Sequence, residues 1–257
     1  MCFKNKVVLI TGASSGIGAA TAIKLAKLSA KIAIVGRNKT KLLNVSVKCE
    51  NLGTKPLVII ADVTKDEDVV RLVNETVTYF GKLDVLLNNA GSVFRGSIFA
   101  DNVINVFDMM MNTNLRSAVH ITNLAAKHLV ESKGCIVNVG SIGGRGFFVP
   151  ENFSYGVSKA GLEYFTKSAA LEFSSKGVRV NVVLPGPTIT DCLDSSGLDE
   201  DGKAEQWRKL GGKTALGKVS EADEIADVIV FLASDKAKSV TGASYVVDNG
   251  MLLKGLN

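Results

Sequence analysis

Short apolar runs alternate with longer segments of helical periodicity along the whole chain. The apolar runs lie at 7–11, 31–35, 57–61, 85–88, 135–139, 178–184 and 245–248. The helical patterns lie at 16–28, 38–51, 66–80, 103–131, 155–175 and 222–233, and we expect the fourth to be broken. Several runs are apolar at nearly every position, which is typical of strands covered on both faces of a parallel sheet. The alternation therefore predicts an α/β fold, a doubly wound parallel sheet with right-handed crossovers.

One domain is expected to span 1–257, because no composition shift or low-complexity segment divides the chain. The stretch 190–218 fits neither pattern, since it is polar and rich in glycine. A long irregular segment within a compact domain is usually a functional loop. The sequence therefore predicts an irregular lid over a substrate site at about 190–218.

Composition and charge exclude several classes of protein. The chain is 46% hydrophobic and 21% charged, and it shows neither a secretory leader nor a membrane-spanning run, so we expect a cytoplasmic protein without a membrane partner. The net charge is +5, but the lysines are dispersed, which favours a solvated surface over a nucleic-acid site. The four cysteines (Cys2, Cys49, Cys135 and Cys192) are scattered, so we expect free thiols and no metal site.

A glycine-rich turn joins the first apolar run to the first helical pattern. In "TGASSGIG", residues 11–18, the turn contains Gly12, Gly16 and Gly18. Glycine lets backbone amides approach a phosphate closely, and the N-terminus of the helix adds a partial positive charge. By itself, such a turn is also compatible with a plain tight connection. Its position after the first strand of an alternating chain favours phosphate binding.

These eight residues resemble the cofactor signature of the short-chain dehydrogenase/reductase family, and six further motifs of that family follow in order. They are Asp62-Val63, the run Asn88-Asn89-Ala90-Gly91, Asn114, Ser141, the pair Tyr155 and Lys159, and Pro185-Gly186. The resemblance implies a Rossmann fold. It also implies an oxidoreductase that transfers a hydride between a nicotinamide dinucleotide and a small-molecule substrate.

The resemblance implies four catalytic residues, Asn114, Ser141, Tyr155 and Lys159. Tyr155 would be the general acid in carbonyl reduction and the base in alcohol oxidation. Lys159 lies four residues later, on the same helical face, where its ammonium would favour the phenolate and hold the nicotinamide ribose. Ser141 would bind the substrate oxygen, and Asn114 would help hold a water that relays protons. Without the family pattern, both residues would be interpreted as structural, Ser141 as a cap at the end of a strand and Asn114 as a polar helix residue with a locally bonded side chain.

One spacing departs from the family pattern. The family commonly places its serine thirteen residues before the tyrosine, whereas Ser141 lies fourteen residues before Tyr155. We interpret the difference as one extra residue within "GGRGFFVP", which keeps Ser141 at the strand end. In the ungapped alternative, Gly140 takes the position of the serine and the catalytic set lacks that hydroxyl.

Cofactor choice depends on the end of the second strand, where NAD-binding proteins carry an acidic residue for the adenosine ribose. That position is Gly36, followed by Arg37. No carboxylate repels a 2′-phosphate there, Arg37 can hold one, and Ser14 adds a hydroxyl. The sequence therefore favours NADP(H) over NAD(H). Ser15 stands where some NADP-preferring relatives carry a basic residue, so that second signal is absent.

The other cofactor contacts also follow from the resemblance. Asp62-Val63 would contact the adenine, Asn89-Ala90-Gly91 the ribose and nicotinamide side, and "PGPTIT" (185–190) the carboxamide and pyrophosphate, whereas Asn88 would stabilise the sheet. The expected cofactor-binding residues are Gly12, Ser14, Gly16, Ile17, Gly18, Arg37, Asp62, Val63, Asn89, Ala90, Gly91, Tyr155, Lys159, Pro185, Gly186, Thr188 and Thr190.

Three functions are compatible with these residues. The first is NADP-dependent interconversion of a ketone and a secondary alcohol in a hydrophobic substrate, such as a steroid or isoprenoid. Apolar surface for it would come from Phe94, Met111, Phe147, Phe148 and Trp207. The second is reduction of a 3-oxoacyl thioester. The third is a dinucleotide-binding protein without turnover, against which the intact proton relay argues. Relatives assemble through the helices near 113–131 and 155–175, so a homodimer or homotetramer is expected.

Overall fold

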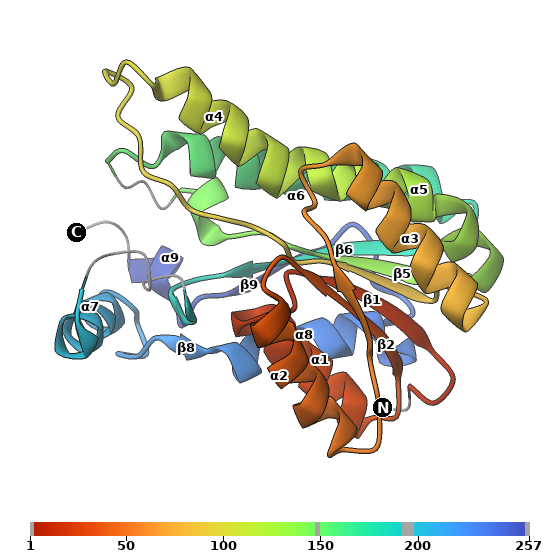
Figure 1. Cartoon of the computed structure of the whole chain (residues 1–257). Coiled ribbons are helices and arrows are strands. Elements are labelled where there is room, and N and C mark those ends of the chain that lie inside the picture. Colours follow the sequence, from red (N-terminus) through yellow and green to blue (C-terminus); the bar gives the residue numbers. More distant parts are fainter. Residues whose placement is uncertain (1–2, 147–149, 192–197, 255–257) are drawn as a thin grey trace.

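The computed structural model describes residues 3–146, 150–191 and 198–254 and contains the predicted parallel sheet (Figure 1). Seven strands form it: β1 (Val7–Thr11), β2 (Lys31–Gly36), β3 (Leu57–Ile60), β4 (Val85–Asn88), β5 (Cys135–Val139), β6 (Arg179–Pro185) and β9 (Ser244–Val247). Their order is β3-β2-β1-β4-β5-β6-β9, and every neighbouring pair is parallel. The predicted doubly wound sheet is therefore confirmed, and each apolar run forms one strand.

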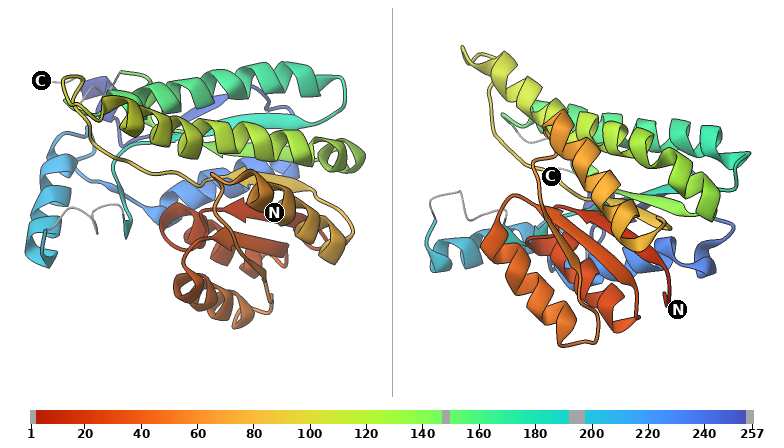
Figure 2. Two further views of the ribbon diagram at one scale, coloured as in Figure 1. Left: turned by 45° about the horizontal axis from the view of Figure 1, so that its top comes forward. Right: turned by 45° about the vertical axis from the view of Figure 1, so that its right-hand side comes forward.

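Helices cover both faces of the sheet (Figures 1 and 2). One layer contains α1 (Gly16–Lys27), α2 (Lys39–Glu50) and α8 (Ala222–Ala233), and the other contains α3 (Asp66–Phe80), α5 (Ser117–Ser132) and α6 (Phe153–Ser174). Successive side chains of a strand point to opposite faces. In β1, Val8 and Ile10 pack in the core beneath α1 and α8, while Val7 and Leu9 pack in the core beneath α3 and α5. Burial on both faces explains why β1 is apolar from Val7 to Ile10.

The helix expected over 103–131 is interrupted without being broken. It consists of α4 (Val103–Met111), a π-helical turn η1 (Asn112–Arg116) and α5. The backbone stays helical from α4 into α5, and in place of the expected break the helix widens by one π-helical turn. Such turns are rare and often lie at functional sites.

The expectation of an irregular segment at 190–218 is wrong for its second half, which contains α7 (Glu200–Gly212). Every residue of α7 is described, and Gly211 alone is buried, so the helix lacks the apolar face that the sequence pattern detects. Capping and charge stabilise it instead: the Asp199 side chain accepts a hydrogen bond from the Gly202 N–H, and Arg208 pairs with Glu205 one turn away. Residues 192–197 of the predicted lid, and Phe147 and Phe148, lie outside the described residues.

Short elements complete the chain beyond both ends of the strands. β7 (Thr188–Ile189) pairs in parallel with β8 (Ser220–Glu221), η2 (Ile142–Gly144) follows β5, and η4 (Asp235–Ala237) and α9 (Met251–Lys254) flank β9. Cys49 and Cys135 are free and buried. In the described part of the chain, every helix is too short or too polar to cross a membrane.

Candidate functional site

The glycine turn lies between β1 and α1, beside the loop that follows β4. Gly12 has φ +64°, and a Cβ added to it would lie 2.8 Å from the Ala90 Cα. A Cβ on Gly18 would lie 2.5 Å from the Asn89 Nδ2. That amide donates to the carbonyl oxygens of Thr11 (2.9 Å) and Gly12 (3.0 Å). The Asn89 side chain therefore holds the turn in shape, and side chains at positions 12 and 18 have no room. Contact of Asn89 with the ligand stays a prediction.

The N-terminus of α1 has the chemistry of an anion site. Within the described chain, its N-cap Ser15 makes no side-chain capping bond and its first turn has no acidic residue. By contrast, α3 begins with Asp66, Glu67 and Asp68. The orphan N–H groups and the dipole of α1 therefore favour a negatively charged ligand. Thr190 lies at the same place, because a Cβ on Gly16 would be 2.9 Å from the Thr190 Cγ2.

The carboxyl ends of β1, β2 and β3 bring the predicted adenosine-side residues together. A Cβ on Gly36 would lie 3.5 Å from the Ser14 Oγ, and Arg37, which is exposed, has a guanidinium nitrogen 3.9 Å from the Asp62 Oδ2. Burial alone would raise the pKa of the Asp62 carboxyl, but hydrogen bonds from Thr64 and the charge of Arg37 outweigh it and lower that pKa. Val63 is buried in the core beneath α3.

Tyr155 and Lys159 lie on successive turns at the start of α6. The Lys159 side chain is buried, its Nζ donates to the Val139 carbonyl oxygen at the end of β5 (2.8 Å), and this nitrogen lies 5.8 Å from the centre of the Tyr155 ring. Burial lowers the pKa of Lys159 to about 8. An ammonium has three donors, so the bond to Val139 leaves capacity for ribose hydroxyls and a water. The helical spacing therefore juxtaposes the two side chains as predicted.

Asn114 connects η1 with the loop after β4 and with α6, and it flanks the lysine. Its side chain accepts from the Ser92 N–H (2.8 Å) and donates to the Ser92 carbonyl oxygen (3.0 Å) and the Ser158 Oγ (3.0 Å). A Cβ on Gly91 would lie 3.3 Å from both the Asn114 Oδ1 and the Lys159 Nζ. Ser92 and Ser158 were not predicted as site residues. Each directly adjoins a predicted one, which is the only sequence signal they carry.

Ser141 caps η2 and lies beside the tyrosine. Its Oγ accepts from the Gly143 N–H (3.1 Å). A Cβ on Gly143 would lie 3.4 Å from that Oγ and 3.2 Å from the Tyr155 Cε1. The serine hydroxyl and the tyrosine ring therefore both lie within 3.4 Å of the same position beside Gly143, which makes the two side chains neighbours.

The structure distinguishes Ser141 from Gly140, the alternative for the serine position. Gly140 is buried, and a Cβ on it would lie 2.5 Å from the Leu184 Cδ2 and 3.0 Å from the Val182 Cγ2. Both neighbours belong to a buried apolar cluster with Ile142. A hydroxyl at position 140 would therefore point into the core, which leaves Ser141 as the residue that borders the tyrosine.

Gly140→Ala is expected to lower the free energy of unfolding by about 1–3 kcal/mol, because its methyl group overpacks this cluster. Urea unfolding measures the change. Gly212→Ala is the matched control, since a Cβ at that position meets nothing within 4 Å. Equal stabilities of the two variants would contradict the assignment of position 140 to the core.

Asn88 has the structural role expected of it. Its Nδ2 donates to the Asn138 Oδ1 (2.9 Å) and the Thr122 Oγ1 (3.2 Å), and Asn138 donates in turn to the Thr166 Oγ1 (2.8 Å). Asn88, Asn138 and Thr166 are all buried. The network ties β4 and β5 to α5 and α6, so it fixes the sheet edge on which the site is built.

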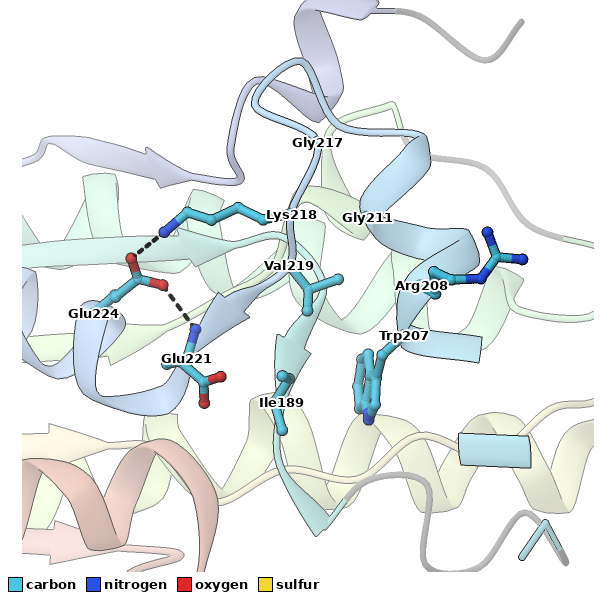
Figure 3. A pocket seen from close by; sticks show the side chains of 9 residues that line it. All are labelled: Ile189, Trp207, Arg208, Gly211, Gly217, Lys218, Val219, Glu221 and Glu224. Carbon is cyan, nitrogen blue, oxygen red and sulfur yellow. Dashed lines mark hydrogen bonds and ion pairs between the residues drawn. The ribbon is translucent and has the colours of Figure 1, made fainter. Parts of the chain in front are cut away.

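The segment after β6 separates the site from a neighbouring pocket. The Thr188 Oγ1 donates to the Gly186 carbonyl oxygen (3.0 Å), and Pro185 ends β6. Ile189, between Thr188 and Thr190, points the other way, into a pocket of 420 Å³ between α7 and β8 (Figure 3). Trp207 and Val219 also line this pocket. Its lining, as far as the described residues go, includes no predicted catalytic or cofactor residue, so it lies beside the site.

Comparisons with known proteins agree with this geometry. The family model described as enoyl-(acyl carrier protein) reductase matches residues 12–252. A glucose 1-dehydrogenase of Gluconobacter oxydans is 34% identical over 98% of this chain and 94% of its own length. A 3-oxoacyl-acyl-carrier-protein reductase of Staphylococcus epidermidis is 34% identical over 97% of this chain and 100% of its own length.

Two solved structures extend the likeness to three dimensions. A Caenorhabditis elegans short-chain dehydrogenase/reductase of unknown function, crystallised with cofactor, superposes with a TM-score of 0.92 at 32% identity and covers 98% of this chain and 96% of its own. A Burkholderia cenocepacia short-chain dehydrogenase in complex with NADP has a TM-score of 0.88 at 30% identity and covers 98% and 100%. Likeness in sequence and structure thus spans the sheet, the glycine turn and the residues around Tyr155. The chain belongs to the short-chain dehydrogenase/reductase family, whose members are oxidoreductases that bind a nicotinamide dinucleotide.

Proposed function

We propose that the chain is an NADP(H)-dependent oxidoreductase that interconverts a ketone and a secondary alcohol in a hydrophobic substrate. The observation that carries the proposal is the grouping of Ser141 and Tyr155 on either side of Gly143, with the buried Lys159 one helical turn below. A hydroxyl, a phenol and an ammonium around one space are suited to proton transfer at a single substrate oxygen.

The residues present fit a dinucleotide. The glycine turn and the uncapped N-terminus of α1 would hold the pyrophosphate, together with Thr190. Asp62 and Arg37 would hold the adenosine end, and Lys159 the nicotinamide ribose. The position is the one expected for an open α/β sheet, at the carboxyl ends of β1 and β4, where the strand order reverses.

The nicotinamide supplies hydride exchange when bound, and the protein supplies position and proton transfer. Ser141 would donate a hydrogen bond to the substrate oxygen. Tyr155 would donate its proton to that oxygen in reduction and accept it in oxidation. The nearby ammonium of Lys159 favours the phenolate that reduction leaves behind. Asn114, fixed by Ser92 and Ser158, would orient a water that returns the proton through Lys159.

Substrate class is tested by NADPH oxidation with a panel of steroid, isoprenoid, quinone, dicarbonyl and 3-oxoacyl thioester ketones. We expect turnover of at least one hydrophobic ketone. The thioester is the second candidate, because a 3-oxoacyl-acyl-carrier-protein reductase is 34% identical over nearly the whole chain. Demonstrated NADPH binding with no turnover of any ketone would favour a binding protein and contradict the proposal. The described part of the lid expected at about 190–218, residues 198–218, is proposed to cover the substrate.

Arg37→Ala is expected to weaken NADPH binding about 10-fold and to leave NADH binding unchanged, because a charge-assisted hydrogen bond to the 2′-phosphate is lost. Fluorescence titration with each dinucleotide measures both affinities. The difference should shrink at high salt, since Arg37 is 77% exposed and its charge is screened. Equal loss of NADH and NADPH affinity would show that Arg37 does not read the 2′-phosphate.

A homo-oligomer is proposed, with α6 in the interface. Val157, Tyr164 and Leu171 repeat at seven-residue intervals and are 47%, 76% and 78% exposed. Exposed apolar stripes of this kind mark interaction surfaces. Light scattering should give a multiple of 27.2 kDa, and Leu171→Asp should shift the mass toward the monomer. A wild-type monomer would exclude this surface as a stable self-interface.

A further inference from the structure

Three consecutive residues of the segment after Ser141 contact three successive turns of α6. Gly143 meets the Tyr155 ring, as described above. A Cβ on Gly144 would lie 2.6 Å from the Ala160 N and 2.8 Å from the Lys159 carbonyl carbon. Arg145 reaches Glu163, eight residues after Tyr155. The segment after Ser141 therefore runs along the face of α6 that carries the tyrosine and the lysine. At Gly144 the segment and the helix are so close that a side chain would not fit between their backbones.

The contact of Arg145 with Glu163 is a fork-like ion pair. The Arg145 Nη2 donates to the Glu163 Oε1 (2.6 Å), and its Nε donates to Oε2 (2.9 Å) and, at 3.1 Å, to Oε1. The Glu163 side chain is 8% exposed, whereas that of Arg145 is 35% exposed. Two parallel N–H···O bonds fix orientation as well as distance, which a single bond does not.

Glu163 also has partners that do not depend on Arg145. The Ser244 Oγ of β9 donates to Oε1 (2.9 Å), and the Lys167 Nζ lies 3.0 Å from the same oxygen. The Arg145 guanidinium, with these neighbours, lowers the pKa of Glu163 to about 2, so the carboxyl is ionised at neutral pH. The carboxylate is thus bonded to β9 and to Lys167 as well as to Arg145.

We propose that Arg145 and Glu163 are positioning residues that hold the Ser141 turn against α6, so that the serine hydroxyl and the tyrosine border one substrate oxygen. The inference rests on the proposed function of Ser141 and Tyr155. The ion pair fixes the turn as far as Arg145, which keeps Ser141 beside the tyrosine.

An ion pair kept only for stability is a weaker explanation. Burying a carboxylate costs free energy that the pairing often only offsets, and apolar residues would stabilise this position at least as well. The two bonds from Arg145 to the Glu163 carboxylate add a fixed orientation of the guanidinium, and hence of the turn that carries it. A displacement of about 1 Å at a reacting group can lower a rate by about 100-fold, so a small shift of the turn is sufficient to reduce catalysis.

The test compares Arg145→Ala, Arg145→Lys and the control Arg71→Ala. Arg71 forms a comparable pair on α3, with a 2.6 Å bond to Asp68. Arg145→Ala leaves Glu163 bonded to Ser244 and Lys167, so the fold is expected to persist. We expect kcat of the Arg145→Ala enzyme to fall about 10- to 100-fold, while the NADPH Kd stays within about 2-fold of wild type. Arg145→Lys should recover part of kcat, because lysine restores the charge and a single bond without the fork.

Hydrogen exchange of residues 141–146, followed by mass spectrometry, gives a readout that needs no substrate. The Gly143 and Gly144 amides donate to the Ser141 Oγ and carbonyl oxygen, and Arg145→Ala should accelerate their exchange while Arg71→Ala does not. Unchanged exchange and unchanged kcat would overturn the inference and leave the proposed function intact. Accelerated exchange in Arg145→Ala, combined with a wild type that reduces no ketone, would support the positioning role of Arg145 and contradict the proposed function. Equal losses of kcat in Arg145→Ala and Arg71→Ala would overturn the inference that Arg145 is a positioning residue.

Discussion

Replacing Tyr155 with phenylalanine is expected to lower kcat by about 100- to 10,000-fold, the range that a positioned general acid contributes. The reason is local. Phenylalanine keeps the ring against Gly143 and within the same distance of Lys159, but it removes the phenolic hydroxyl that is proposed to donate the proton. The glycine turn and Arg37 are untouched, so NADPH affinity should change little.

Stopped-flow or steady-state NADPH oxidation measures the effect on whichever ketone the wild type reduces. Tyr79→Phe, at a site on α3 that is 66% exposed, is the matched control and should keep full activity. Raising the pH should not restore the Tyr155→Phe enzyme, because phenylalanine has no hydroxyl that could give or take a proton at any pH. A Tyr155→Phe enzyme with more than about a tenth of wild-type kcat would assign the proton to another group, with Ser141 the next candidate.

The arrangement of the sheet was predictable because its physical cause is visible in the sequence. Strands buried on both faces are apolar at consecutive positions, as at residues 7–10 of β1, 32–35 of β2 and 135–137 of β5. α7 was not predictable in this way. It buries no apolar face, contains Gly202 within its first turn, and depends on the Asp199 cap and on charge pairs that a search for hydrophobic periodicity does not register.

Within the candidate site, contacts between residues close in sequence were predictable, and contacts between distant parts of the chain were not. Tyr155 and Lys159 are related by one helical turn, so their proximity follows from spacing alone. Asn114 is held by Ser92 and Ser158, which lie 22 and 44 residues away in the chain. Glu163 receives bonds from Arg145 and Ser244, from opposite sides of it in sequence. Contacts of this kind depend on the packing of several elements, and no single window of sequence contains them.

Lys159→Met is expected to abolish turnover and yet to stabilise the protein at neutral pH. Burial lowers the pKa of the folded lysine from 10.5 to about 8, so the folded chain binds its proton less tightly than the unfolded chain does. Between pH 8 and 10.5 the unfolded chain holds a proton that the folded chain has released, so this group makes stability rise with pH across that window. Below pH 8 both states are protonated, and the full cost of burying the charge, about 3 kcal/mol, is present.

Methionine removes that cost but loses the hydrogen bond to Val139, which offsets part of the gain. We therefore expect Lys159→Met to raise the free energy of unfolding by about 1–2 kcal/mol at pH 7, with the gain declining toward pH 10. Urea unfolding at pH 7 and at pH 10 measures the gain in the free energy of unfolding. Lys55→Met is the control, because the Lys55 side chain is 77% exposed, and its free energy of unfolding should equal that of the wild type at both pH values. If the variant is less stable than wild type at pH 7, the buried Lys159 ammonium does not lower the free energy of unfolding, which contradicts the prediction. A gain in stability with loss of activity would instead indicate that Lys159 is retained for its chemistry, since a group that weakens the fold is explained by its function.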